Sequence, residues 1–198
     1  MFGRPVDWMT YLEWSAALCG VVSVVLIAHG SAWGFVAGFA MGALYVAVFF
    51  DARLYADSGF QAVYALLQLR GLYLWRRGRG PQTGRITRVT RDELAWGLAL
   101  ATLAALALGA ALTAATDAAL PYADSAAVTF AVMAQVWLNR RRIENWIAWV
   151  LVDVWAAGVY LVKDLRPTAA LFLLFAALSA HGWRRWSLAL RAQEAPAP

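Results

Sequence analysis

The 198-residue chain has few charged and few reactive side chains. Only 15% of its residues are charged, and it contains two histidines and one cysteine. A soluble domain carries about a quarter charged residues, so this composition argues against a soluble protein. Because Cys19 is the single cysteine, an internal disulfide and a dithiol redox motif are both excluded.

Motifs for catalysis are also missing from the sequence. It contains no HExxH and no GxSxG stretch, and the two histidines, His29 and His181, fall in different halves of the chain. An enzyme active site needs a nucleophile with a base, or a set of metal ligands. We therefore expect no catalytic residue, no metal and no cofactor, and an intramembrane enzyme is only a minor alternative.

The sequence is instead rich in apolar blocks. Hydrophobic residues make up 62% of the chain, its mean hydropathy is +0.57, and it contains 11 tryptophans. The blocks are about 15 to 24 residues long, which is the length that a helix needs to cross a bilayer. Tryptophan and tyrosine gather near the block ends, as amphipathic rings do at the headgroup level. The pattern predicts a multi-pass membrane protein in contact with lipid, and the net charge of +5 reflects loop arginines rather than a nucleic acid partner.

Seven blocks predict an all-α membrane protein with seven transmembrane helices. The predicted spans are residues 8–29, 32–50, 54–75, 94–116, 121–138, 145–162 and 167–187. The fourth span, from Ala95 to Ala115, contains no polar side chain larger than threonine. We interpret it as a packing or spacer helix.

Basic residues divide unequally between the two sides that seven spans define. One side collects Arg4, Arg53, Lys163 and Arg166, and the other collects twelve arginines within residues 76–91, 140–142 and 184–191. Basic residues of short loops stay in the cytoplasm. We therefore expect the N-terminus outside the cell and the C-terminus in the cytoplasm.

The two halves of the chain resemble each other at an offset of 111 residues. This shift aligns Gly71 with Gly182 and Trp75 with Trp186. Three spans, one linker span and three more spans give two halves of the same orientation. The expected fold is therefore a 3+1+3 parallel pseudo-repeat, with the substrate site near the bilayer midplane between the halves.

We expect one transmembrane domain over residues 1–198, built from five parts. The parts are a first half (1–75), a solvated cytoplasmic linker (76–93), a linker helix (94–116), a second half (121–187) and a disordered tail (188–198). Small residues let helices approach closely in membranes. We predict this role for Gly38, Gly42 and Gly158.

Polar side chains interrupt the apolar spans at helical spacings. A polar group inside a membrane is costly without a partner and usually faces the bundle interior. In the sixth span Asn145, Trp149 and Asp153 follow one another at four-residue steps, so they share one helical face. The candidate ligand site consists of Gln61, Gln68, Thr129, Gln135, Asn145, Trp146, Trp149, Asp153, Tyr160 and His181.

This set fits a small, flat ligand with positive charge and polar edges. Indole faces attract cations and stack on aromatic rings, and amide side chains can both donate and accept hydrogen bonds. Structural alternatives remain for each residue. The indoles could anchor the helix at the interface, the glutamines could join helices, Asp153 could pair with a basic side chain, and His181 could be packed in the core.

Three stretches carry a resemblance to a known family. They are FFDARLYADSGFQAVYALLQLRGLYLW (Phe49–Trp75), AQVWLNRRRIENWIAWVLVDVW (Ala134–Trp155) and HGWRRW (His181–Trp186). Together they resemble the PnuC family of bacterial vitamin transporters, and the resemblance spans nearly the whole chain. Its most specific motifs are the FFxxxLYA–Q block and the ENWxxW step.

The resemblance implies a seven-helix, SWEET-like fold that takes up nicotinamide riboside by facilitated diffusion across a bacterial inner membrane. The N-terminus would then lie in the periplasm. Cytoplasmic phosphorylation would trap the cargo, and the protein would form a homo-oligomer, a trimer by family resemblance. The family's WxxW motif falls on Trp146 and Trp149, and its polar site positions fall on Gln61, Gln68, Gln135 and Asn145.

The cargo stays open between related compounds. His181 stands where relatives carry asparagine, and Arg70 replaces an aromatic residue. Nicotinamide riboside is the first expectation, with thiamine, riboflavin or a deoxynucleoside as alternatives. A sugar carrier is a further alternative.

Overall fold

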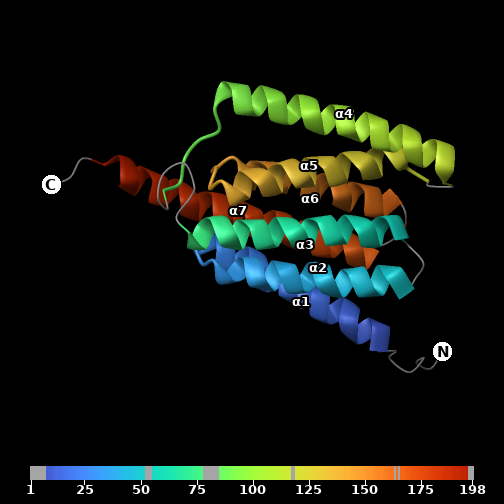
Figure 1. Cartoon of the computed structure of the whole chain (residues 1–198). Helices are drawn as coiled ribbons and strands as arrows, with labels where there is room; N and C mark the ends of the chain where they lie inside the picture. The colour runs from blue at the N-terminus through green and yellow to red at the C-terminus, as the bar shows by residue number, and fades with distance from the viewer. Residues whose placement is uncertain are drawn as a thin grey trace. The chain divides into compact units, whose positions relative to one another are not determined.

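The computed structural model describes residues 8–51, 55–77, 85–116, 119–162, 164 and 166–195. They form seven α-helices: α1 (Trp8–Ala28), α2 (Trp33–Asp51), α3 (Tyr55–Arg76), α4 (Arg91–Ala115), α5 (Pro121–Asn139), α6 (Asn145–Val162) and α7 (Arg166–Glu194) (Figure 1). The described residues contain no strand, only an isolated bridge between Thr87 and Arg142. The predicted all-α fold is confirmed, and most helix ends lie within three residues of the predicted ones.

Four of the described helices are long and apolar enough to cross a membrane by length and composition. They are α1, α2, α4 and α6. The other three helices carry polar residues within their spans, such as Gln68 in α3 and Gln135 in α5. The chain is therefore a multi-pass membrane protein.

The chain divides into two compact units, Met1–Gly80 and Pro81–Pro198, and each is described by itself. In the first unit α2 packs against both α1 and α3. Ser23 Oγ of α1 donates to the Gly34 carbonyl of α2 at 2.8 Å, and Ser58 Oγ of α3 donates to the Val46 carbonyl at 3.0 Å. These bonds satisfy serine hydroxyls that would otherwise be buried without a partner.

Glycines let the helices of the first unit approach closely, as predicted for Gly38 and Gly42. A Cβ added at Gly42 would lie 3.1 Å from the Ala65 Cβ, and one at Gly38 would lie 2.6 Å from the Gln68 Cδ. The same prediction is wrong for Gly158 in α6. That residue is exposed, and an added Cβ would meet no atom within 4 Å.

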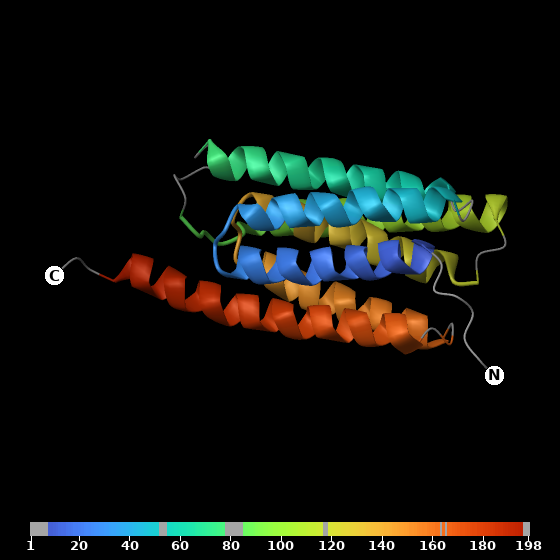
Figure 2. The same ribbon diagram turned by 90° about the horizontal axis from the view of Figure 1, so that it is seen from below.

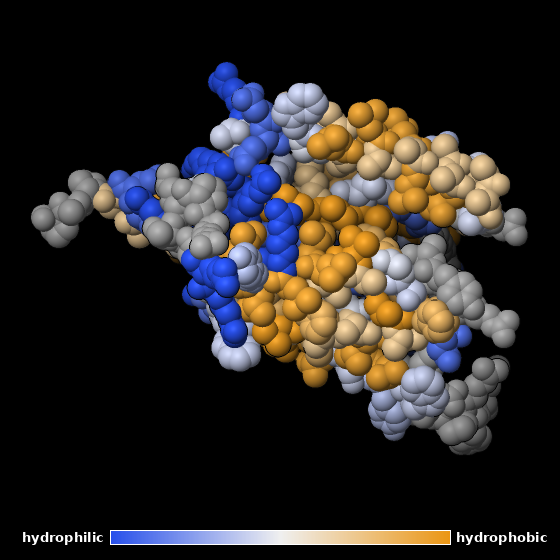
Figure 3. Space-filling model, viewed as in Figure 1, coloured by the Kyte–Doolittle hydropathy of each residue, from blue (hydrophilic) through white to orange (hydrophobic). Residues whose placement is uncertain are grey.

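In the second unit α5 packs against α4 and α6, and α6 packs against α7. Helix α4 buries only a narrow stripe, Ala101, Ala105 and Gly109. A Cβ at Gly109 would lie 2.3 Å from Tyr122 of α5, so small residues set the distance between these two helices. Around α4, at the top of Figure 3, the visible surface is mainly hydrophobic, and hydrophilic residues gather at its N-terminal end.

The 111-residue offset also relates contacts inside the two units. Phe35 packs edge-to-face on Trp75, with ring centroids 5.0 Å apart and an interplanar angle of 76°. The offset maps this pair onto Trp146 and Trp186, which also meet edge-to-face, at 5.4 Å and 85°. Such pairs stabilise helix contacts beyond their buried area. The repeat is therefore visible in the packing of aromatic residues.

Part of the predicted solvated linker is an ordered segment. Residues 78–84 lie outside the described residues, but Arg85–Thr90, here called the docked segment, runs along the turn between α5 and α6. Ile86 is 9% exposed, and Thr87 forms two backbone hydrogen bonds with that turn. A capping box between Thr90 and Glu93 then begins α4, three residues earlier than predicted.

Helix α7 is longer than its apolar span. The prediction of a disordered tail from residue 188 is wrong up to Glu194, where the helix ends. The C-terminal part of α7 extends beyond α6 in both orientations (Figures 1 and 2). Leu190 in these additional turns is 6% exposed, so the end of the helix is packed rather than solvated. Residues 196–198 lie outside the described residues.

Candidate cargo-binding site

Buried amides gather where α5 ends and α6 begins. Gln135 and Asn145 are fully buried, and Asn139 is 3% exposed. Gln135 Nε2 donates to Asn139 Oδ1 at 3.0 Å, and Asn145 Nδ2 donates to the Arg142 carbonyl. The amide nitrogens of Gln135 and Asn145 therefore each donate a hydrogen bond within the protein. The oxygens Gln135 Oε1 and Asn145 Oδ1 are buried without a hydrogen-bond partner among the described residues.

The two indoles of the WxxW motif contact different neighbours. Trp146 is 2% exposed and packs on Trp186 and Gly182 of α7, where a Cβ at Gly182 would lie 2.6 Å from its ring. Its Nε1–H is buried with no acceptor in the described part of the chain. Trp149 is partly buried and packs against the cluster of Ala134, Trp137 and Ala148.

The first unit presents its own buried amide. Gln68 is 1% exposed on α3, and its amide lies against Gly38 of α2. Gln61 lies two helical turns earlier on the same face of α3 and is half-buried. Both Oε1 atoms are buried and accept no hydrogen bond from the residues that the structure describes.

Asp153 has a hydroxyl partner. It is 3% exposed, and Ser179 of α7 hydrogen-bonds its carboxylate. The sequence allowed an ion pair with a basic residue as an alternative for Asp153. The partner in this contact is instead a serine hydroxyl. Aspartate and serine instead join α6 to α7 near the middle of both helices.

The remaining predicted site residues are less suited to contact a cargo. Thr129 Oγ1 donates to the Ser125 carbonyl of its own helix at 3.0 Å, and Tyr160 stacks on Phe172 with centroids 5.2 Å apart. His181 is exposed. The alternative that His181 is packed in the core is therefore wrong, and its exposure separates it from the buried amides.

Ser125 was missed by sequence reasoning. It is 1% exposed, and its Oγ is buried with no hydrogen-bond partner among the described residues. The available signal was its position one turn before Thr129, on the same face of α5. A serine in an apolar helix usually bonds its own backbone, so this signal is weak.

Several buried polar atoms have no hydrogen-bond partner among the described residues. A buried donor or acceptor that is unpaired costs about 1–3 kcal/mol, so several such atoms indicate a function for them. Five predicted site residues supply one each: Gln61, Gln68, Gln135, Asn145 and Trp146. The first unit supplies two of these acceptors, Gln61 and Gln68, and the second unit supplies two more acceptors and the indole donor of Trp146.

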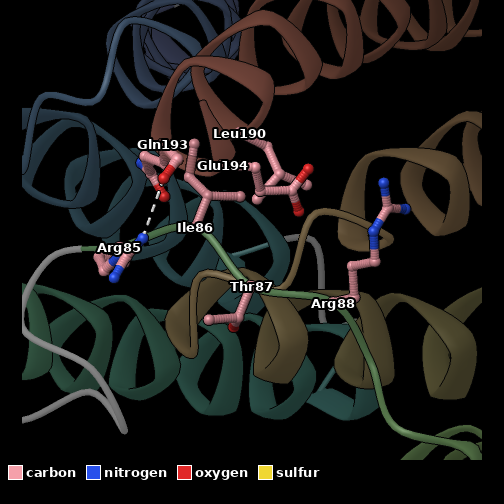
Figure 4. Close-up of a pocket in the computed structure, with 7 residues that line it drawn as sticks. All are labelled: Arg85, Ile86, Thr87, Arg88, Leu190, Gln193 and Glu194. Carbon is pink, nitrogen blue, oxygen red and sulfur yellow. Dashed lines mark hydrogen bonds between the residues drawn. The ribbon is translucent and has the colours of Figure 1, made fainter. Parts of the chain in front are cut away.

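A cavity of about 240 Å³ lies elsewhere, between the docked segment and the end of α7 (Figure 4). It is lined by Arg85, Ile86, Thr87, Arg88, Leu190, Gln193 and Glu194. Arg85 Nη2 donates to the Gln193 carbonyl at 3.1 Å, which satisfies one of the last carbonyls of α7. None of the predicted cargo residues lines this cavity.

Known proteins share both the fold and the sequence pattern. A crystal structure of the vitamin B3 transporter PnuC matches with a TM-score of 0.75 at 20% identity, over 92% of this chain and 83% of that chain. The riboflavin/roseoflavin transporter RibM of Streptomyces davaonensis is 25% identical over 94% of this chain and 90% of its own length. The nicotinamide riboside transporter PnuC of Neisseria mucosa is 23% identical over 93% of this chain and 73% of its own length.

The sequence model of one family covers most of the chain. The family is described as nicotinamide mononucleotide transporter, and it matches residues 10–188. That range includes all seven helices except the first two residues of α1 and the last turns of α7. The protein is a membrane transporter that belongs to the nicotinamide mononucleotide transporter family, which includes PnuC.

Proposed function

We propose that this protein takes up nicotinamide riboside by facilitated diffusion across a bacterial inner membrane. The observation that carries the proposal is the set of buried amide oxygens without partners, beside the buried indole Nε1–H of Trp146. A ribose offers several hydroxyl donors, and a carboxamide offers both a donor and an acceptor. The cargo would therefore satisfy the polar groups that the fold leaves unpaired.

The proposed site combines residues from both halves of the chain. Gln61 and Gln68 would bind from the first half, and Gln135, Asn145, Trp146 and Trp149 from the second. A cationic pyridinium ring would stack on an indole, an interaction of about 0.5–2 kcal/mol. Asp153, which is hydrogen-bonded to Ser179, would attract the positive charge in its ionised form. Thr129, Tyr160 and His181 are less suited, for the reasons given above.

The proposed topology and a cytoplasmic kinase would together make the uptake of nicotinamide riboside one-way. Twelve arginines on one side of the seven helices support a cytoplasmic C-terminus and a periplasmic N-terminus. A passive carrier only equilibrates its cargo. Net uptake would therefore depend on a cytoplasmic kinase that phosphorylates the riboside, because this conversion keeps the internal concentration of the riboside low.

Proteoliposomes that contain only this protein test the proposal. We expect labelled nicotinamide riboside to enter until the internal and external concentrations are equal, and no further. Enclosing a riboside kinase with ATP should then raise the accumulated label above that level. Absence of flux for nicotinamide riboside in active, correctly folded protein would overturn the proposed cargo.

Riboflavin is the second candidate, because the relative RibM carries riboflavin and roseoflavin in its name. Riboflavin also combines a flat ring with a hydroxylated chain, but it is uncharged. The charge of the cargo therefore separates nicotinamide riboside from riboflavin. A preference for riboflavin that persists in Asp153→Asn would favour this candidate, whereas a preference for nicotinamide riboside that disappears in the same variant would support the first.

A further inference from the structure

The docked segment holds the turn between α5 and α6. Thr87 N–H donates to the Arg141 carbonyl at 3.1 Å, and Ile143 N–H donates to the Thr87 carbonyl at 2.9 Å. Val89 N–H donates to Glu144 Oε2 at 2.8 Å. Arg141 has a φ of +55°, which non-glycine residues seldom adopt. The turn therefore has an uncommon conformation that bonds from another segment keep in place.

The side chain of Arg142 connects three parts of the second unit. Its Nη1 donates to Thr87 Oγ1 at 2.8 Å and to the Arg88 carbonyl at 3.0 Å, and its Nη2 donates to Glu93 Oε1 at 2.8 Å. Only 13% of this side chain is exposed, and 23% of Glu93. A planar guanidinium directs its donors at fixed angles, which an ammonium cannot do. Arg142 thus fixes the turn against the docked segment and the first turn of α4.

The backbone of the same residue orients Asn145. Both the N–H of Asn145 (3.2 Å) and its Nδ2 donate to the Arg142 carbonyl. Because the amide nitrogen is held there, Asn145 Oδ1 points in one set direction. In the first turn of α6 the Trp146 N–H donates to the Ile143 carbonyl, also at 3.2 Å. A shift of Arg142 would therefore turn the Asn145 amide and move the start of α6.

We infer that Arg142 is a positioning residue: its guanidinium, anchored on Glu93 and the docked segment, fixes the carbonyl that aims the Asn145 amide at the cargo. The inference rests on the proposed function, in which Asn145 binds the cargo. Arg142 itself does not contact the cargo. It acts on how well Asn145 distinguishes one cargo from another.

Arg140 supplies a matched control in the same turn. Its Nη1 lies 3.4 Å from Glu93 Oε1, and 43% of its side chain is exposed. Arg142→Gln and Arg140→Gln remove the same charge from neighbouring positions. We expect Arg142→Gln to raise the Kd of the preferred vitamin about ten-fold, the effect of one misplaced hydrogen bond. We also expect it to change the ratio of the Kd values for nicotinamide riboside and riboflavin, and Arg140→Gln to leave both within about two-fold.

Asn145→Ala tests the route of the effect. If Arg142 acts through Asn145, Arg142→Gln should add less than about two-fold to the Kd once Asn145→Ala is present. Equal losses in both backgrounds would overturn the inference, as would equal effects of Arg142→Gln and Arg140→Gln. Arg142→Lys should recover little, because a lysine cannot contact Thr87, Arg88 and Glu93 together.

A second variant keeps the test decisive if Arg142→Gln does not fold. Glu93→Gln preserves the capping box, since glutamine can also accept from the Thr90 N–H, but it removes the ion pair with Arg142. We expect it to shift the same Kd ratio in the same direction. If folded Glu93→Gln has the same ratio of Kd values as the wild type, the positioning role of Arg142 is contradicted. Binding of a vitamin by the wild-type protein would still support the proposed function. Wild-type protein that binds neither vitamin would instead contradict both.

Discussion

Gln68 is almost fully buried on α3, its Oε1 has no hydrogen-bond partner among the described residues, and its amide lies against Gly38. At the scale of single residues, such amides distinguish a binding helix from a spacer helix. A buried glutamine that only joined two helices would use both ends of its amide. The remaining acceptor is what the proposed function assigns to the cargo.

Replacing Gln68 with methionine should separate binding from stability. Methionine has a similar volume but no group that needs a hydrogen bond, so removal of the unpaired acceptor should leave the thermal midpoint unchanged or raised. Cargo affinity should fall about ten-fold. Leu66→Met, at an exposed position of the same helix, is the control. A clear loss of stability with unchanged affinity would show that Gln68 is structural.

Gly38→Ala tests the same amide from the other side. The added Cβ would lie 2.6 Å from Gln68 Cδ, so the flexible end of Gln68 must shift. We expect a loss of affinity comparable to that of Gln68→Met, with only a small change in thermal midpoint. Gly158→Ala, where the added Cβ meets no atom within 4 Å, should leave transport intact. Equal transport by the two alanine variants would contradict this prediction.

The sequence identified the buried amides because they are polar residues within apolar spans. The structure adds which of these polar residues are buried and which are exposed. The sequence could not exclude His181, because the same polar signal is produced by a residue on the exposed side of α7. It also could not recognise the role of Arg142. A run of three arginines indicates topology equally well, and it is the hydrogen bonds to Thr87 and the Arg88 carbonyl that distinguish Arg142 from Arg140.

At the scale of elements, hydrophobic length predicted the helices closely because a bilayer fixes how long an apolar helix must be. The docked segment and the end of α7 escaped prediction for the opposite reason. Both lie outside the apolar spans, and their order comes from specific tertiary contacts, such as burial of Ile86 and Leu190. Their polar composition resembles that of a solvated loop.

Helix α4 offers a test of element packing that is independent of cargo binding. Gly109→Leu would push its side chain into Tyr122 of α5, and overpacking of this kind costs about 1–3 kcal/mol. We therefore expect a lower thermal midpoint. Ala104→Leu, on the exposed side of α4, should leave it unchanged. The Kd for the cargo, measured below the transition, should be similar in both variants, since no proposed cargo residue lies on α4.

At the scale of the whole molecule, the internal repeat is expressed in matching aromatic contacts, Phe35 with Trp75 and Trp146 with Trp186. The sequence offset predicted the equivalence of Trp75 and Trp186, but not their partners, because Phe35 and Trp146 are different residue types. The two units also differ in their polar content. Gln68 corresponds to Ser179 at the same offset, and Ser179 hydrogen-bonds Asp153, whereas Gln68 Oε1 has no partner among the described residues.

The proposed passive mechanism makes a prediction for transport as a whole. In proteoliposomes without a kinase, a protonophore should leave both the initial rate and the final level of vitamin uptake unchanged, because no step of the cycle uses a proton gradient. An imposed pH gradient of either sign should have no effect on the final level. Uptake that collapses with the protonophore would contradict facilitated diffusion.

The central claim is that buried amides and indoles of this chain bind the ring and hydroxyl groups of a vitamin. The most direct measurement is an experimental structure of the protein with nicotinamide riboside or riboflavin bound. We predict a ring stacked on Trp146 or Trp149, with hydrogen bonds to Gln68, Gln135 and Asn145. A vitamin bound away from these residues, for example in the cavity beside Arg85 and Gln193, would contradict the account.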